Sequence, residues 1–127
     1  KAWWDKTFWK QSKDKKKEKF YAELEILLSS GLDIKSSLDI IVEEQSKESD
    51  KSLFKNISNL VIAGGSLSEA LKQSGKFSNY EYFSIKIGEE SGQLNGVLEN
   101  LAVFFGKKIK QNRQLVNAFS YPVLVLI

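Results

Sequence analysis

Apolar residues recur every three or four positions along most of this chain, the spacing of one face of an α-helix. Glycines or short polar segments interrupt the pattern, so it predicts six helices joined by short turns and no strand. The expected fold is an all-α, antiparallel six-helix bundle. The first predicted helix runs from about Lys17 to Ser30, and the second is capped by Asp33 or Ser36. The third, around Leu53 to Val61, follows a linker at 46–51. The remaining three begin after Ser66, after Ser78 and after Gly92, and the last of them continues to Ser120.

Several residues mark the ends of these helices. Gly31 follows the first apolar stretch and can take the left-handed conformation that ends a helix. Ser66 with Glu69, and Ser78 with Glu81, have the Ser-x-x-Glu spacing of a capping box. Each box therefore predicts the start of a helix.

The composition removes most classes of active site. A chain of 127 residues is long enough for one domain with a buried core. It has no Cys and no His, so disulfides, thiolate sites and the commonest general base are absent. Glu89 and Glu90 are adjacent and would point about 100° apart on a helix, so they cannot form an acid–base pair. We predict no catalytic residue, no cofactor and no metal site.

The first nineteen residues form a lead-in with two possible interpretations. An aromatic cluster is followed by a lysine-rich run from Lys10 to Lys19. Runs of charge are usually solvated, so the segment could make only incidental contacts. Aromatic rings beside a cationic run also suit a membrane surface or an acidic protein face. The aromatic cluster consists of Trp3, Trp4, Phe8 and Trp9.

The end of the chain is apolar from Ala118 to Ile127. This is too short to span a bilayer, which takes about 20 apolar residues. It could be a helix buried in the bundle or in a dimer interface. We favour the start of a transmembrane helix that continues beyond this sequence, because no polar residue returns after Tyr121 and Pro122 is tolerated near the head of such a helix. A preceding basic cluster would keep the domain cytoplasmic; it consists of Lys107, Lys108, Lys110 and Arg113.

The most specific segment is residues 86–105, KIGEESGQLNGVLENLAVFF. It contains the end of one helix, a tight turn at a glycine and the apolar stripe of the next helix, which predicts a helical hairpin. GEESGQL followed by an LxxLA-type run resembles the signature of the inner-membrane platform proteins of type II secretion and type IV pilus machines, the GspF/PilC family. FYAELEILLSSGLDIKSSLDII and YPVLVL agree with the same family in order and spacing. The residues that carry the resemblance are Gly31, Gly88, Glu89, Ser91, Gly92, Leu94, Leu98, Leu101, Ala102 and Pro122.

The resemblance implies a non-enzymatic platform in the bacterial inner membrane, of which this part is a cytoplasmic six-helix domain. Its implied partners are the secretion or pilus assembly ATPase, other inner-membrane platform components and pilin or pseudopilin subunits, and it implies a homo-oligomer, a dimer or higher. We therefore divide the chain into a lead-in (1–19), a helical domain (20–117) and the start of a transmembrane helix (118–127). Asp33 stands where the family often has proline, and residues 103–106 carry no acids where relatives often do, which argues against a calcium site.

Two further questions stay open at this level. A soluble basic helical adaptor, binding nucleic acid or acidic lipid through the run from Lys10 to Lys19, is the alternative function. Glu89 could be merely solvated, or it could fix the turn of the hairpin by accepting hydrogen bonds from backbone amides or by pairing with a basic residue. In the second case its loss would destabilise the domain more than the loss of Glu90.

Overall fold

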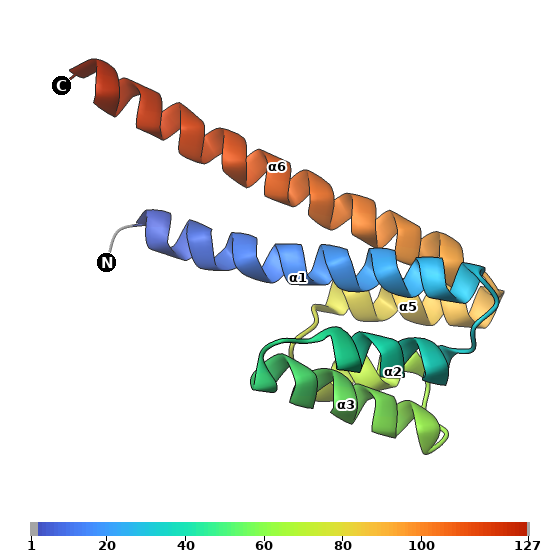
Figure 1. The fold of residues 1–127 in the computed structure, drawn as a ribbon. Coiled ribbons are helices and arrows are strands. Elements are labelled where there is room, and N and C mark those ends of the chain that lie inside the picture. The colour runs from blue at the N-terminus through green and yellow to red at the C-terminus, as the bar shows by residue number, and fades with distance from the viewer. Residues whose placement is uncertain (1–2, 127) are drawn as a thin grey trace.

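The computed structural model describes the backbone of residues 3–126 and the side chains of residues 13–111. This part of the chain forms six helices and no strand, which confirms the predicted all-α class and the number of helices (Figure 1). The helices are α1 (Trp3–Ser29), α2 (Ile34–Glu44), α3 (Glu48–Ile62), α4 (Leu67–Ser74), α5 (Asn79–Ser91) and α6 (Leu94–Leu126).

The helices contact one another in a closed circuit, each with the next and α6 with α1. The two longest helices, α1 and α6, lie side by side and run in opposite directions, and the shorter helices α2 to α5 form a group against them (Figure 1). Both long helices extend past this group on the same side of the molecule, so the two ends of the chain lie on that side. The molecule therefore has a compact body and a projecting pair of helices.

The core of the body takes side chains from every helix. Each of these side chains is fully buried or nearly so, and burying one aliphatic residue stabilises a fold by about 1.5–3 kcal/mol. Phe20 of α1 also stacks on Phe54 of α3, with ring centroids 5.0 Å apart. The apolar stripes read from the sequence therefore converge on one core, which includes Leu24, Leu38, Ile57, Leu71, Ile85 and Leu98.

Two predicted boundaries were wrong. The first helix begins at Trp3 rather than near Lys17, and it passes residue 19 without interruption. Lysine, glutamine and glutamate are good helix formers, so a lysine-rich run can continue a helix even without an apolar stripe. The third helix begins at Glu48, inside the predicted linker, because Glu48 and Asp50 suit the positive end of the helix dipole.

The last helix continues as one element through Pro122 to Leu126. Residues 118–126, predicted to start a transmembrane helix, therefore form the last turns of α6. Their side chains, and the whole of Ile127, lie outside the part of the chain that the structure describes. Within the described residues, none of the helices holds an apolar stretch of the length that crossing a membrane needs.

Candidate functional site

The hairpin between α5 and α6 is built around two glycines. Gly92 has φ +72° and ends α5 in the left-handed conformation, as its place in the motif predicts. The backbone N–H of Gln93 donates to the carbonyl of Gly88 at 2.8 Å, which closes the turn. A Cβ on Gly88 would lie 2.8 Å from Cγ2 of Val97 and 3.2 Å from Cα of Leu94. Gly88 thus lets the start of α6 approach α5 more closely than any other residue would allow.

The apolar residues of the motif hold α6 against the rest of the body. Leu98 and Leu101 are fully buried, while Leu94 and Ala102 pack at the edge of the same core. The hydroxyl of Ser91 donates to the carbonyl of Ile87 at 2.8 Å, inside the last turn of α5. These motif residues therefore shape the hairpin and its packing.

Glu89 has a role that sequence reasoning placed at the wrong helix. Its carboxylate accepts hydrogen bonds from the backbone N–H of Leu67 at 2.8 Å and of Ser68 at 3.2 Å. Backbone amides are the predicted kind of partner, but these belong to the first turn of α4 and not to the α5–α6 turn. A carboxylate there satisfies donors that the helix itself cannot satisfy and complements the helix dipole. Glu89 therefore joins the hairpin to α4.

Glu81 is a second carboxylate that joins helices, and it is completely buried. With Ser78 it forms the predicted capping box at the start of α5. It also accepts a hydrogen bond from the hydroxyl of Tyr21 at 2.6 Å and pairs with Nζ of Lys17 at 2.8 Å, both from α1. The box could be read from the sequence, but the two contacts with α1 could not, because they link positions 60 and 64 residues apart.

Tyr21 and Lys17 complete this buried group. Burial, and then the charge and hydrogen bond of Glu81, raise the pKa of the Tyr21 phenol far above its usual range, so it stays protonated and donates. Lys17 also lies over the rings of Phe77 and Phe105, 5.2 and 5.5 Å from their centroids. Lys17 is thus an interior contact and not a solvated member of the lysine run.

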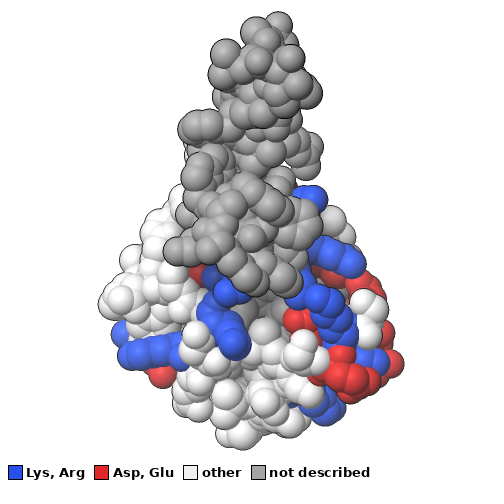
Figure 2. All heavy atoms as spheres, turned by 90° about the vertical axis from the view of Figure 1, so that its left-hand side faces the viewer, with Lys and Arg blue, Asp and Glu red and all other residues white. Residues whose placement is uncertain are grey.

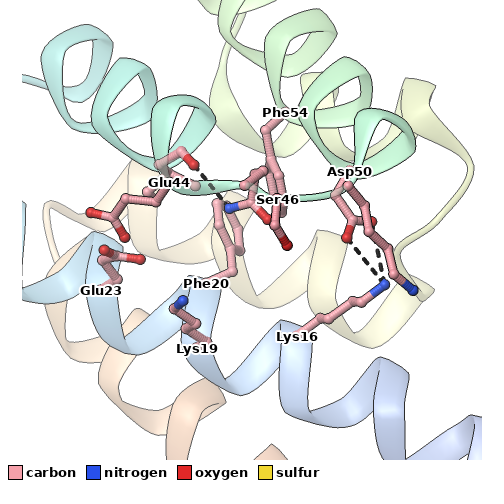
Figure 3. Close-up of a pocket in the computed structure, with 11 residues that line it drawn as sticks. Lys16, Lys19, Phe20, Glu23, Glu44, Ser46, Asp50 and Phe54 are labelled. Carbon is pink, nitrogen blue, oxygen red and sulfur yellow. Dashed lines mark hydrogen bonds and ion pairs between the residues drawn. The ribbon is translucent and has the colours of Figure 1, made fainter.

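A pocket at the junction of α1, α2 and α3 gathers charges of both signs (Figure 3). Lys16 pairs with Asp50 at 3.1 Å, and Glu23 and Glu44 point toward each other. Burial, and then the hydrogen bond and charge of Glu44, raise the pKa of Glu23 to about 7. These side chains engage one another across the helices, so we interpret the pocket as a contact between α1 and the α2–α3 turn and not as a site for a substrate.

One helix face presents apolar side chains to the solvent. Tyr80, Phe83 and Ile87 of α5 are 54%, 55% and 64% exposed and follow one another at i, i+3 and i+7. The ring of Phe104 on α6 lies 5.0 Å from that of Tyr80 and extends the stripe. Scattered exposed apolar residues are ordinary, but aligned ones of this size mark a contact surface. We call Tyr80, Phe83, Ile87 and Phe104 the α5 stripe.

The structure describes the side chains of the three lysines in the predicted basic cluster but not that of Arg113. Lys107 and Lys110 are exposed, and Lys108 lies over the rings of Phe104 and Phe105. On the face from which α1 and α6 project, Lys and Arg side chains surround the base of the two helices, with Asp and Glu side chains among them on one side (Figure 2). The remaining members of the two predicted surface groups belong to α1 and α6, with side chains outside those described: Trp3, Trp4, Phe8, Trp9 and Arg113.

The polar groups at the centre of the described helices act in contacts between helices. Among the residues with described placement, no three His, Cys, Asp or Glu side chains converge as metal ligands would. The buried carboxylate of Glu81 and the half-buried carboxylate of Glu89 both join helices. Among the described side chains, those of the α5 stripe and of the basic face are exposed to the solvent and can contact a ligand.

Comparisons with known proteins then give the family. Residues 20–127 match the family model of the type II secretion system (T2SS), protein F. The chain is 29% identical over 108 residues to the type IV pilus assembly protein PilC of Thermus thermophilus, with 85% of this chain and 27% of the relative aligned. It is 27% identical over 109 residues to PilC of Myxococcus xanthus, with 85% and 26% aligned. It is 26% identical over 108 residues to the type II secretion system protein F of Xanthomonas campestris pv. campestris, with 84% and 27% aligned.

Because the family model covers most of the chain, this protein belongs to the family of type II secretion system protein F, as its motif predicted. Its relatives include proteins of type IV pilus assembly as well as of type II secretion. The chain spans about a quarter of the length of the curated relatives it matches. The first nineteen residues lie outside the match.

Proposed function

We propose that this chain is the first cytoplasmic domain of an inner-membrane platform protein, which holds the moving parts of a type II secretion or type IV pilus machine. The observation that carries this proposal is the family match over residues 20–127, which includes the motif hairpin. The contacts between helices through Glu81 and Glu89 support it, because a mount for moving subunits has to be rigid. The role demands binding surfaces and no catalysis.

In this proposal α6 carries the domain to the membrane. The helix is continuous from the hairpin to Leu126, and its last ten residues are mostly apolar. Lys107, Lys108 and Lys110 precede that stretch, and basic residues beside a membrane segment favour the cytoplasmic side. The apolar end would be the beginning of a transmembrane helix.

The α5 stripe is our candidate for the surface that meets the assembly ATPase. It lies away from the core and presents three aromatic rings and one isoleucine without burying any of them fully. Aromatic residues of this kind are the commonest anchors of protein interfaces. The same role includes contacts with other platform components and with pilin or pseudopilin subunits, and assembly into a dimer or higher homo-oligomer.

The experiment compares two equally exposed isoleucines. Ile87 lies in the stripe at 64% exposure, and Ile26 on α1 is 63% exposed. Ile87→Asp should reduce co-purification of the ATPase of the same machine about tenfold or more, the loss expected for an interface anchor, while Ile26→Asp should leave it unchanged. Equal retention by both variants would exclude the stripe as the contact. Failure of the unaltered protein to sediment with inner membranes would overturn the platform role itself.

The soluble basic adaptor remains the second candidate, because the lysine-rich run continues as a regular helix. It predicts binding to duplex DNA that weakens steeply with added salt. A salt-titrated DNA-binding assay beside the ATPase co-purification separates the two functions. DNA binding without ATPase binding would favour the adaptor.

A further inference from the structure

The modest net charge of the chain conceals a strong separation of charge. Residues 1–19 contain eight basic and three acidic residues, and residues 107–127 contain four basic and no acidic residue. The segment between them contains seven basic and thirteen acidic residues. The total of +3 therefore combines two strongly basic ends with an acidic body. Charge segregated in this way favours binding to an anionic surface.

The fold brings the two basic ends together. A Cβ on Gly106 of α6 would lie 2.6 Å from Oε2 of Glu18 on α1, so these residues are opposite each other. One helical turn nearer the body, the ring of Tyr21 stacks on Phe105 at 5.9 Å. The lysines just before Glu18 and those just after Gly106 thus lie near one another on the helix pair, and Lys and Arg side chains surround its base (Figure 2).

The acidic groups near these lysines do not cancel them. Of the three acids in residues 1–19, Asp14 is 5% exposed and Glu18 is half-buried against α6. Lys13, Lys15, Lys107 and Lys110 are exposed to the solvent. The outer surface of the pair is therefore basic, while the two acids with described side chains are directed inward.

The same pairing places the aromatic lead-in level with the apolar end of α6, although the two helices diverge away from the body (Figure 1). From the contact between Glu18 and Gly106, a rise of 1.5 Å per residue along both helices brings positions 3–9 level with about positions 115–121. The apolar stretch of α6 begins at Ala118. At about 100° per residue, the positions of Trp3, Trp4, Phe8 and Trp9 are distributed around α1 instead of along one face. A distribution on all sides suits immersion in a lipid interface better than packing against a single protein surface.

We propose that the first three turns of α1 and the basic turns of α1 and α6 together form a binding surface for the anionic headgroups of a phospholipid bilayer. Lysine ammonium groups would contact lipid phosphates, and the tryptophans would lie at headgroup depth. This surface deepens the proposed platform role by adding a second membrane contact, whose tryptophans and α1 lysines lie outside the family match and whose α6 lysines lie inside it. The helix pair would then meet the bilayer at two points instead of one.

The tryptophans of the chain provide a direct test, because all three lie within residues 3–9. The whole chain is reconstituted into vesicles of phosphatidylcholine and phosphatidylglycerol that carry bromine at shallow or deep acyl positions. Shallow bromine should quench tryptophan emission more than deep bromine does. A second chain, with Trp3, Trp4 and Trp9 changed to Phe and Leu124→Trp, reports the end of α6 and should be quenched by deep bromine.

The two chains separate the failure of this inference from the failure of the proposed function. Quenching at Leu124→Trp without quenching of the natural tryptophans would overturn the second membrane contact and leave the platform role intact. Absence of quenching in both chains would overturn both. A tryptophan response to duplex DNA but not to vesicles would identify the surface as a nucleic-acid site and would also overturn the inference.

Matched charge variants test the lysines. Changing Lys13, Lys15, Lys107 and Lys110 to Gln should weaken binding of the chain to phosphatidylglycerol vesicles, measured by sedimentation, roughly a thousandfold, since each lysine near an anionic surface contributes about 1 kcal/mol. Changing the exposed Lys35, Lys47, Lys55 and Lys76 of the body to Gln alters the net charge equally and should have little effect. Equal weakening by both sets would show that only net charge matters and would contradict a localised surface.

Discussion

The starts of α4 and α5 carry the same sequence pattern but are capped by different carboxylates. Both have serine at the N-cap and glutamate three residues later, and in both the serine accepts a hydrogen bond from the backbone of that glutamate. At α5 the carboxylate of Glu81 accepts a hydrogen bond from the backbone N–H of Ser78 at 2.7 Å. At α4 the carboxylate of Glu69 instead accepts from the hydroxyl of Tyr82, and Glu89 of α5 binds the free amides.

The difference shows what a capping pattern can and cannot specify. The pattern identifies a helix start because serine satisfies one donor locally. The other backbone N–H groups of the first turn donate to whichever carboxylate the tertiary fold brings near. At α5 that carboxylate is local, and it additionally holds Lys17 and Tyr21 of α1. At α4 it comes from another helix, so the same four-residue pattern joins different parts of the body in the two places.

Among the variants that test this comparison, Glu81→Ala should change the free energy of unfolding most. It leaves Lys17 and the Tyr21 hydroxyl without a buried partner and should lower the free energy of unfolding by about 3–5 kcal/mol. Tyr21→Phe removes one hydrogen bond to Glu81 but leaves its carboxylate paired with Lys17, and it should cost about 1–2 kcal/mol. Urea unfolding followed by circular dichroism measures both. A smaller loss for Glu81→Ala than for Tyr21→Phe would show that the buried ion pair does not stabilise the fold.

Gly88→Ala tests the close approach of α6 to α5 in the hairpin that positions Glu89. The new Cβ would collide with Val97, and overpacking of this kind costs about 1–3 kcal/mol. Gly96→Ala is the control, since a Cβ there meets nothing within 4 Å and should stabilise α6 by about 0.5–1 kcal/mol. Thermal unfolding of the two variants should therefore shift in opposite directions, and a shift in the same direction would contradict the close approach of α6 to α5.

Glu89→Ala isolates the remote cap. Loss of a helix N-cap interaction costs about 1 kcal/mol, and Leu67 and Ser68 would lose their acceptor at once. Glu90 is exposed, so Glu90→Ala should change the free energy of unfolding by less than about 0.5 kcal/mol. Hydrogen exchange should also locate the loosened amides in the first turn of α4. Equal melting temperatures, or faster exchange confined to the α5–α6 turn, would contradict the assignment.

The pair of Glu23 and Glu44 predicts the smallest effect, a dependence on pH. The folded state raises the pKa of Glu23 from 4.5 to about 7, so it holds a proton that the unfolded chain releases. This contribution to stability is complete below about pH 4.5 and is lost as the pH rises through 7. Glu23→Gln should flatten that loss in urea titrations from pH 5 to pH 8. The exposed Glu43→Gln is the control, and an unchanged slope for Glu23→Gln would exclude the pair as its cause.

Sequence reasoning succeeded where a contact is local. The helix end at Gly92, the cap at Asp33 and the box of Ser78 and Glu81 each depend on residues within a few positions, and the structure contains all three. The side chain and backbone of Ser36 also hold the pKa of Asp33 below its usual range by hydrogen bonding. The number of helices followed from the same local signals.

It failed where a residue acts at a distance. Nothing near Lys17 in the sequence shows that its ammonium group reaches Glu81, since the run around it is uniformly basic. Likewise, the partner of Glu89 depends on how α4 docks beside α5. The α5 stripe has helical spacing, but periodicity alone does not say which of two apolar faces the core will cover.

The opposite directions of α1 and α6 have a mechanical consequence. A tension applied to α6 along its own axis has to slide that helix past α1, so many side-chain contacts resist it simultaneously in shear. A sideways load on the projecting end would instead peel the two helices apart, one contact after another. The domain is therefore stiff to axial pulling and compliant to bending.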